Sequence, residues 1–355
     1  MTQPDDRNVA VRAAFAEQAR SCIALGSPFM GRLMALLAER DWPDGAVADA
    51  VLGWKGDPGS GADNPALRLA GGLHRLVLDR SDPALAAIYP PRDASDAALW
   101  RAVSDALMRH ESHLLDALTR APQTNEVRRA AALAPALAMI AAATRTPLAL
   151  REVGCAAGLN LRADLFRVTA NGQAYGPEGA AVQLAPDWEG DTPPPYPPEI
   201  VERRGVDLAP LDPHNAEDRA RLLSYLWPDQ PERRTWTEAA LDLASRVPAR
   251  VDRGDALDWL ADQLPRRTQG IATVVFHTIA WQYLPGAARA RGADLLSRAG
   301  AAATADTPLA HLSMEADGGD LAALTLTLWP GGHVHTLARV DFHGRRIVWT
   351  GPVAL

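Results

Sequence analysis

Apolar residues recur at three- and four-residue steps through most of the first 143 positions, a spacing that predicts helices. Clusters of Pro, Gly and Asp separate these stretches and predict the turns between them. The five expected helices cover residues 11–20, 29–40, 64–78, 98–118 and 125–143. We therefore expect an all-helical domain over residues 1–145.

The longest apolar run lies inside the last of these helices, at residues 130–143. It is rich in Ala, is interrupted by Pro135 and is shorter than the ~20 residues that a membrane-spanning helix needs. We expect a buried helix and no membrane partner.

The pattern changes at Pro147, where short β-type runs begin to alternate with helical segments. The sequence ends in a hairpin with a third extended piece, over residues 321–349. Such alternation predicts an α/β domain over residues 146–355, with a mostly parallel sheet and an antiparallel hairpin at its C-terminal edge. The other expected strands cover residues 147–154, 201–212, 249–255, 271–281 and 309–315.

Composition removes several classes of function. The formal net charge of the 355 residues is -7, so the electrostatic attraction that drives most nucleic-acid binding is missing. Lys55 is the single lysine and no Gly-Lys-Ser/Thr occurs, which excludes a P-loop. Two cysteines, Cys22 and Cys155, do not form a disulfide framework, and the N-terminal segment is polar where a signal peptide is apolar. We expect a cytoplasmic protein.

The most informative segment is the Gly-bearing turn that follows the first expected strand. Dinucleotide folds need glycine at the first, third and sixth positions of this turn, and the third and sixth are Ala156 and Leu159. The turn more closely resembles the acidic-x-Gly-x-Gly-x-Gly turn of S-adenosylmethionine-dependent methyltransferases, with Glu152, Gly154, Ala156 and Gly158 in its places. Ala156 is the one departure, and packing of strand against helix is the alternative use of these small residues.

The resemblance implies two further acidic residues. One ends the second strand and binds the ribose hydroxyls, for which Asp207 or Asp212 is available, and we assign Asp207. The other follows the third strand and lies near the adenine amine, where Asp255 stands in a Gly-Asp-Ala turn. Asp207 lies 53 positions beyond Gly154 rather than the usual ~20, which an insertion from about residue 168 to 200 would explain. If that insertion belongs to the sheet, Asp207 is misassigned.

A wider similarity covers most of the chain, which resembles the uncharacterised bacterial proteins grouped as domain of unknown function 2332. That family has Ser where this chain has Ala156, and an aromatic residue where it has Ala163. The resemblance implies a methyltransferase-like Rossmann domain behind a helical domain, and no particular reaction. The segments that carry it are residues 123–137, 152–168, 203–213, 223–244, 254–260, 281–285 and 312–315.

Three polar residues are expected near the cofactor besides those of the turn. Asn125 and Glu126 precede the turn and are expected at the amino-acid end of the cofactor. Capping of the following helix by Thr124 or Asn125 is the alternative. Asn160 follows the turn and is expected to face the ligand. Asp164 is expected to pair with Arg162 or Arg167.

The candidate catalytic residues lie at the carboxyl ends of later strands, where open α/β sheets bind ligands. His277 is a candidate base inside the fourth strand, although such a histidine is more often a core residue. Glu315 is a second candidate base, and Tyr283 together with Trp281 could stack on adenine or substrate. No metal site is expected, because the two histidines of the RHESH segment are one residue short of the HExxH spacing.

These observations favour an S-adenosylmethionine-dependent methyltransferase that acts on an unidentified small molecule. A non-catalytic module that binds a nucleoside ligand or a protein is the alternative. An oxidoreductase ranks last, because Ala156 and Leu159 occupy positions where glycine is required. The sequence does not define the methyl acceptor or the oligomeric state.

Overall fold

The computed structural model describes residues 4–355, so the first three residues of the polar N-terminal segment lie outside it. The chain forms two compact units. Unit 1 comprises the residues up to Thr124 and the segment Ala216–Thr235, and unit 2 comprises Asn125–Asn215 and Trp236–Leu355. The division falls before the fifth expected helix, whereas the change of sequence pattern predicted it after that helix, at 145/146.

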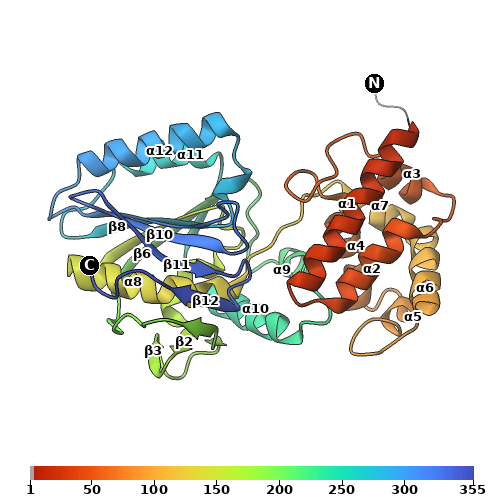
Figure 1. Ribbon diagram of the computed structural model, residues 1–355, viewed down its shortest axis with the longest axis horizontal. Helices are drawn as coiled ribbons and strands as arrows, with labels where there is room; N and C mark the ends of the chain where they lie inside the picture. Colours follow the sequence, from red (N-terminus) through yellow and green to blue (C-terminus); the bar gives the residue numbers. More distant parts are fainter. Residues whose placement is uncertain (1–3) are drawn as a thin grey trace. The chain divides into compact units, whose positions relative to one another are not determined.

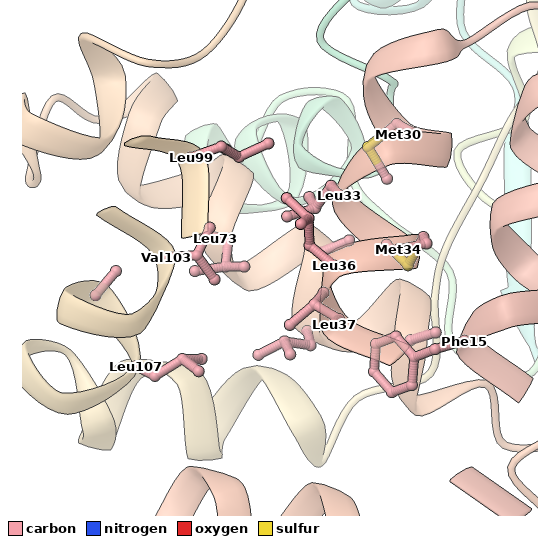
Figure 2. Close-up of a cluster of buried hydrophobic side chains, with 14 of the residues drawn as sticks. Phe15, Met30, Leu33, Met34, Leu36, Leu37, Leu73, Leu99, Val103 and Leu107 are labelled. Atoms are coloured by element: carbon pink, nitrogen blue, oxygen red, sulfur yellow. The ribbon is translucent and has the colours of Figure 1, made fainter. Parts of the chain in front are cut away.

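Unit 1 is built from helices. Their buried apolar side chains, among them Leu33, Leu37 and Leu73, form one core (Figure 2). Ser27, Asn64, Asp82 and Ser95 cap helix N-termini through their side chains, which explains where α2, α4, α5 and α6 begin. The helices are α1 Pro4–Ala24, α2 Pro28–Glu39, α3 Ala46–Leu52, α4 Pro65–Leu78, α5 Pro83–Ala86, α6 Asp96–Arg109, α7 Glu111–Leu118 and α9 Ala216–Ser224.

The segment Ala216–Thr235 belongs to unit 1 because it packs on α4. Glu217 forms a two-bond ion pair with Arg75, at 2.9 and 2.8 Å. The carbonyl of Ser224 lies 3.0 Å from Nδ1 of His74, and Trp227 joins the apolar core. These contacts link residues about 150 positions apart, which no local pattern indicates.

Unit 2 contains a nine-stranded sheet in the order β5-β12-β11-β10-β9-β8-β1-β6-β7. The five strands from β7 to β9 are all parallel, and β10, β11 and β12 continue the sheet with antiparallel pairings. The predicted α/β class, with a mainly parallel sheet and an antiparallel C-terminal part, is confirmed. The strands are β1 Leu148–Val153, β5 Asp187–Glu189, β6 Ile200–Asp207, β7 Arg250–Arg253, β8 Ala272–Thr278, β9 Leu309–Glu315, β10 Ala322–Trp329, β11 His333–Val340 and β12 Arg346–Trp349.

Helices cover both faces of this sheet (Figure 1). α11 (Ala256–Gln263) and α12 (Gly286–Ala301) pack on one face, and α8 (Ala130–Thr144) lies on the other. A 3-10 turn, η1 (Val127–Arg129), precedes α8, and α10 covers Pro231–Ala244. Within the described residues, one helical stretch, Val127–Thr144, is long and apolar enough to cross a membrane, and 72% of it is buried. Such burial is typical of the core helix of a soluble protein.

The expected insertion between the first two parallel strands forms a small sheet of its own. It contains β2 (Arg167–Ala170), β3 (Gln173–Tyr175) and β4 (Gln183–Leu184) in the order β3-β2-β4, with an Asn171-Gly172 turn between β2 and β3. Only β5 of this insertion joins the main sheet, where it pairs with β12 at the far edge. β6 is therefore the direct neighbour of β1.

Candidate functional site

The turn after β1 has the backbone that its small residues predict. Gly154, Ala156 and Gly158 all have positive φ, at 68°, 50° and 67°. A Cβ on Gly154 would stand 2.6 Å from Cβ of Ala280, so only glycine fits there. Ala156 adopts the left-handed region with a side chain, at a cost of roughly 1–2 kcal/mol. A strained, closely packed bend therefore ends the central strand.

Strand order places this bend at a point where ligands bind in doubly wound sheets. Numbered along the chain, the five parallel strands lie in the order 3-2-1-4-5, and the direction of winding changes between β1 and β8. In such sheets the crevice outside the carboxyl ends of the strands, at this switch point, is the usual ligand site. Gly154 follows the end of β1, and Ala280 lies just beyond the end of β8.

Asp207 is the last residue of β6, and its carboxylate touches the bend. Its Oδ2 accepts a hydrogen bond from the amide of Ala156 at 2.8 Å, and its Oδ1 accepts one from the amide of Ala209 at 2.9 Å. The acid expected at the end of the second strand thus lies beside the glycine turn. Asp212 stands farther along the loop and accepts the amide of His214.

The 3-10 helix η2 (Leu159–Leu165) follows the bend, and its first amides are engaged within the protein. Leu159, for example, donates to Oδ1 of Asn125 at 2.9 Å. An amide that already donates to protein is not available to a phosphate oxygen, so this turn is poorly suited to a pyrophosphate. The amides of the bend and of η2 that donate hydrogen bonds within the protein are those of Gly154, Cys155, Ala156, Gly158, Leu159 and Leu161.

Asn125, Glu126 and Asn160 connect the segment before η1 to η2. Asn125 accepts the amide of Leu159, and Nδ2 of Asn160 donates to the carbonyl of Glu126 at 3.2 Å. The Glu126 carboxylate also accepts the amide of Arg128 and so caps η1. Capping was expected of Thr124 or Asn125, and Glu126 has this role instead. Their contact with a cofactor stays a prediction.

Two buried oxygen atoms beside the bend have no hydrogen-bond partner. They are Oε2 of Glu152 and Oδ1 of Asn160. Glu152 is 2% exposed, and Asn160 is 1% exposed. Burial raises the pKa of Glu152 well above its usual range, against the opposing charges of Arg162 and Arg129. Such orphaned polar atoms are costly unless a ligand or water meets them.

A cavity of about 360 Å³ begins at Ala157 in the bend. Its size is within the range of small-molecule sites, about 300–1,000 Å³. Pro210 to His214 form one wall, and the end of α10 with the start of β7 forms another. The cavity therefore touches the bend at Ala157, a residue that is itself 1% exposed, whereas Gly154 is exposed.

Asp255 caps α11. Its Oδ1 accepts the amides of Leu257 and Asp258, at 2.9 and 3.1 Å. It directly follows β7 and Gly254, so it stands at the end of the third parallel strand, as expected.

His277 and Glu315 are brought together. Nδ1 of His277 lies 2.7 Å from Oε1 of Glu315, and the same oxygen accepts the amides of Ala280 and Trp281, both at 3.0 Å. The amide of Gln282 donates to Oε2 of Glu315 at 3.2 Å. Although burial opposes it, these hydrogen bonds lower the pKa of Glu315. The carboxylate thus anchors the segment that follows β8.

The other nitrogen of His277, Nε2, lies 2.9 Å from Nε2 of His311. Burial lowers the pKa of His311 to about 3, and the neighbouring His277 adds to the effect, so His311 is neutral. The ring of Trp281 stacks on that of His277, with centroids 4.7 Å apart. His277 is 1% exposed, whereas Tyr283 is 57% exposed.

Neither His311 nor the role of Arg203 was predicted from the sequence. His311 and Glu315 lie on the same face of β9, because strand residues alternate, and this period could have linked them. Asp164 forms a two-bond pair with Arg203, at 2.6 and 2.7 Å, rather than with Arg162 or Arg167. Within residues 4–355, no three His, Cys, Asp or Glu side chains are grouped so as to hold a metal ion.

The chain belongs to the family described as uncharacterised protein conserved in bacteria, domain of unknown function 2332, whose model matches residues 12–349. No curated protein and no solved structure matches the chain. Two of the segments that carried the family resemblance, at 123–137 and 152–168, contact each other through Asn125 and Asn160.

Proposed function

We propose that this chain is an S-adenosylmethionine-dependent methyltransferase for a small molecule, with a methyltransferase-like Rossmann sheet in unit 2. The observation that carries the proposal is the position of Asp207. It ends the strand beside β1, and its carboxylate contacts the turn that follows β1. An acid in this position is suited to accept hydrogen bonds from ribose hydroxyls.

The chemistry of the bend favours an adenosyl group over a dinucleotide. Amides of the bend donate within the protein, and a pyrophosphate would also meet the negative charge of Asp207. A ligand without phosphate avoids both costs. Glu152 and Asn160 offer buried polar atoms beside the bend, and Asp255 would lie near the adenine amine.

The bound sulfonium supplies an activated methyl group, so the protein needs chiefly to align the acceptor and exclude water. His277, Glu315 and Tyr283 stay predicted catalytic residues. The two nitrogens of His277 contact Glu315 and His311, and Glu315 accepts three amides, so either base would have to give up such a contact to take a proton.

The hydrogen bonds that His277 and Glu315 make within the protein favour the alternative, a non-catalytic binding module. If His277 and Glu315 only hold the segment after β8, a nucleoside could bind at the bend without turnover.

Isothermal titration with S-adenosylmethionine and S-adenosylhomocysteine tests the proposal. We expect both to bind, and Asp207→Asn to weaken binding at least tenfold, because the ribose loses a charged acceptor. Asp294→Asn, at an exposed position of α12 outside the cavity, is the matched control and should bind as the wild type does. Gly154 is a poor test position, since any Cβ there meets Ala280. Absence of heat with both ligands would refute the cofactor assignment.

Turnover separates the enzyme from the module. With methyl-labelled S-adenosylmethionine and an extract of bacterial small metabolites, the enzyme should transfer label to a product. Tight cofactor binding without any labelled product would favour the module and end the catalytic claim.

A further inference from the structure

Unit 1 contains a larger cavity, of about 700 Å³, whose lining residues all belong to that unit. It is bounded by the C-terminal end of α4, by residues 89–92 and by residues 226–231. Its walls are largely apolar, with Val77, Leu78, Leu226 and Trp227 among them. The volume suits a small organic molecule rather than a peptide segment.

Guanidinium groups dominate the charge around this cavity. Arg80, Arg92 and Arg234 line it. Among the lining residues that the structure describes, Asp229 is the one carboxylate, and it accepts the hydroxyl of Ser27 and the amide of Phe29 at the start of α2. Its charge is thus held at a helix N-terminus, where it is stabilised. The cavity therefore offers net positive charge to a ligand.

Arg80 occupies a position that normally favours glycine. It follows α4 with φ at 57°, and its amide donates to the carbonyl of Val77. Glycine is the usual residue at such a helix end, because a side chain in the left-handed region costs about 1–2 kcal/mol. The chain nevertheless has an arginine here, at the edge of the cavity.

A buried polar atom also belongs to the lining. Tyr89 is 1% exposed, and its hydroxyl has no hydrogen-bond partner. The ring stacks near His74, with centroids 6.2 Å apart, and meets Phe29 edge-on at 4.8 Å. A buried hydroxyl without a partner costs about 1–3 kcal/mol, which a polar ligand atom would recover.

We propose that this cavity binds a small aromatic carboxylate. The aromatic body would pack against Trp227, Leu226 and the neighbouring prolines. The carboxylate would bind the guanidinium groups of Arg80 and Arg92 and accept a hydrogen bond from the Tyr89 hydroxyl. Arginine suits this role because its planar donors match a carboxylate in pairs. The inference goes beyond the proposed methyl transfer and does not depend on it, since the lining residues lie in unit 1.

Titration of the full chain with 2-naphthoate and 2-naphthamide tests the charge requirement. The two probes share an aromatic body, and only the first is an anion. We expect 2-naphthoate to bind at least tenfold more tightly. Equal affinities, or no binding of 2-naphthoate at millimolar concentration, would overturn the proposal.

Substitutions test the location. Arg80→Gln with Arg92→Gln should lower 2-naphthoate affinity at least tenfold and leave 2-naphthamide unaffected. Arg101→Gln, an exposed arginine of α6 outside the lining, is the control and should change neither. Tyr89→Phe should weaken binding while the ligand-free protein keeps or gains thermal stability, because an orphaned hydroxyl is removed. Unchanged 2-naphthoate affinity in the double variant would place binding elsewhere and overturn the proposal.

Discussion

His74 shows how one buried residue ties the stability of unit 1 to pH. Burial lowers the pKa of its imidazole to about 4, and the nearby charge of Arg234 lowers it further, against the raising effect of the Ser224 carbonyl. The ring is therefore neutral at pH 7, and Nδ1 serves as the donor to that carbonyl. In the unfolded chain the same group has a pKa near 6.5.

The direction of the pH effect follows from this difference. Below pH 6.5 the unfolded chain binds a proton at His74 that the folded chain refuses until about pH 4, so stability falls across that window. We expect His74 to account for a loss of about 2 kcal/mol between pH 7 and pH 5. Denaturation in urea at both pH values measures it.

His74→Asn is the variant for this prediction, because its side-chain amide can still donate to the Ser224 carbonyl and does not titrate. It should remove about 2 kcal/mol of the wild-type difference between the two pH values. A variant with the wild-type pH dependence would contradict the assignment to His74. His311, in unit 2, also has a lowered pKa and should account for part of the remaining loss.

At the scale of elements, the segment after β8 depends on an acid from the neighbouring strand. Ile279 has φ at 51°, an unfavourable conformation for a β-branched residue. Glu315 at the end of β9 holds the following amides, at Ala280, Trp281 and Gln282. The strain at one strand end is thus offset by charge-assisted hydrogen bonds from the next.

Removing that acid should loosen the segment and destabilise the protein. We expect Glu315→Ala to lower the free energy of unfolding by about 2–4 kcal/mol, because His277 and three partly buried amides lose their acceptor. Glu315→Gln keeps an acceptor and should cost less than half as much. Asp320→Ala, an exposed acid in the loop before β10, is the control. Urea denaturation at pH 7 measures the free energy of unfolding of each variant. If Glu315→Ala is as stable as the Asp320→Ala control, Glu315 does not hold the segment.

Local periodicity predicted the elements better than it predicted their contacts. The strands from β6 to β12 and the helices around them follow from runs of apolar residues that each element carries itself. Three helical details were missed. The short helices α3 and α5 were not predicted, and the expected helix over 98–118 breaks at His110, whose φ and ψ are -114° and 33°. The pairing of β5 with β12 and the contact of His277 with His311 join distant segments, so only the folded chain defines them.

The candidate site also has a part that the sequence predicted and a part that only the fold defines. The bend, with Gly154, Ala156 and Gly158, was predictable because small residues at alternate positions permit positive φ. The position of Asp207 depended on whether the long insertion entered the sheet between β1 and β6, which composition could not decide. The folded insertion forms its own small sheet and adds only β5 to the far edge.

At the scale of the whole molecule, each unit has its own apolar core. One cluster, with Leu33 and Leu73, lies in unit 1, and another, with Val275 and Leu296, lies in unit 2. Cores that share no side chains are expected to open as separate cooperative units. A destabilising substitution in one core should then leave the hydrogen-exchange protection of amides in the other unit unchanged.

Leu73→Ala tests this independence, because Leu73 is fully buried in the core of unit 1. Such a substitution costs about 2–5 kcal/mol, and each 1.4 kcal/mol is a tenfold change in an opening equilibrium. Hydrogen exchange should therefore accelerate about thirtyfold or more in α2 and α4, while amides of β1 and β8 exchange as in the wild type. Val275→Ala should give the reverse pattern. Equal acceleration in both units from either substitution would mean that the two cores unfold as one.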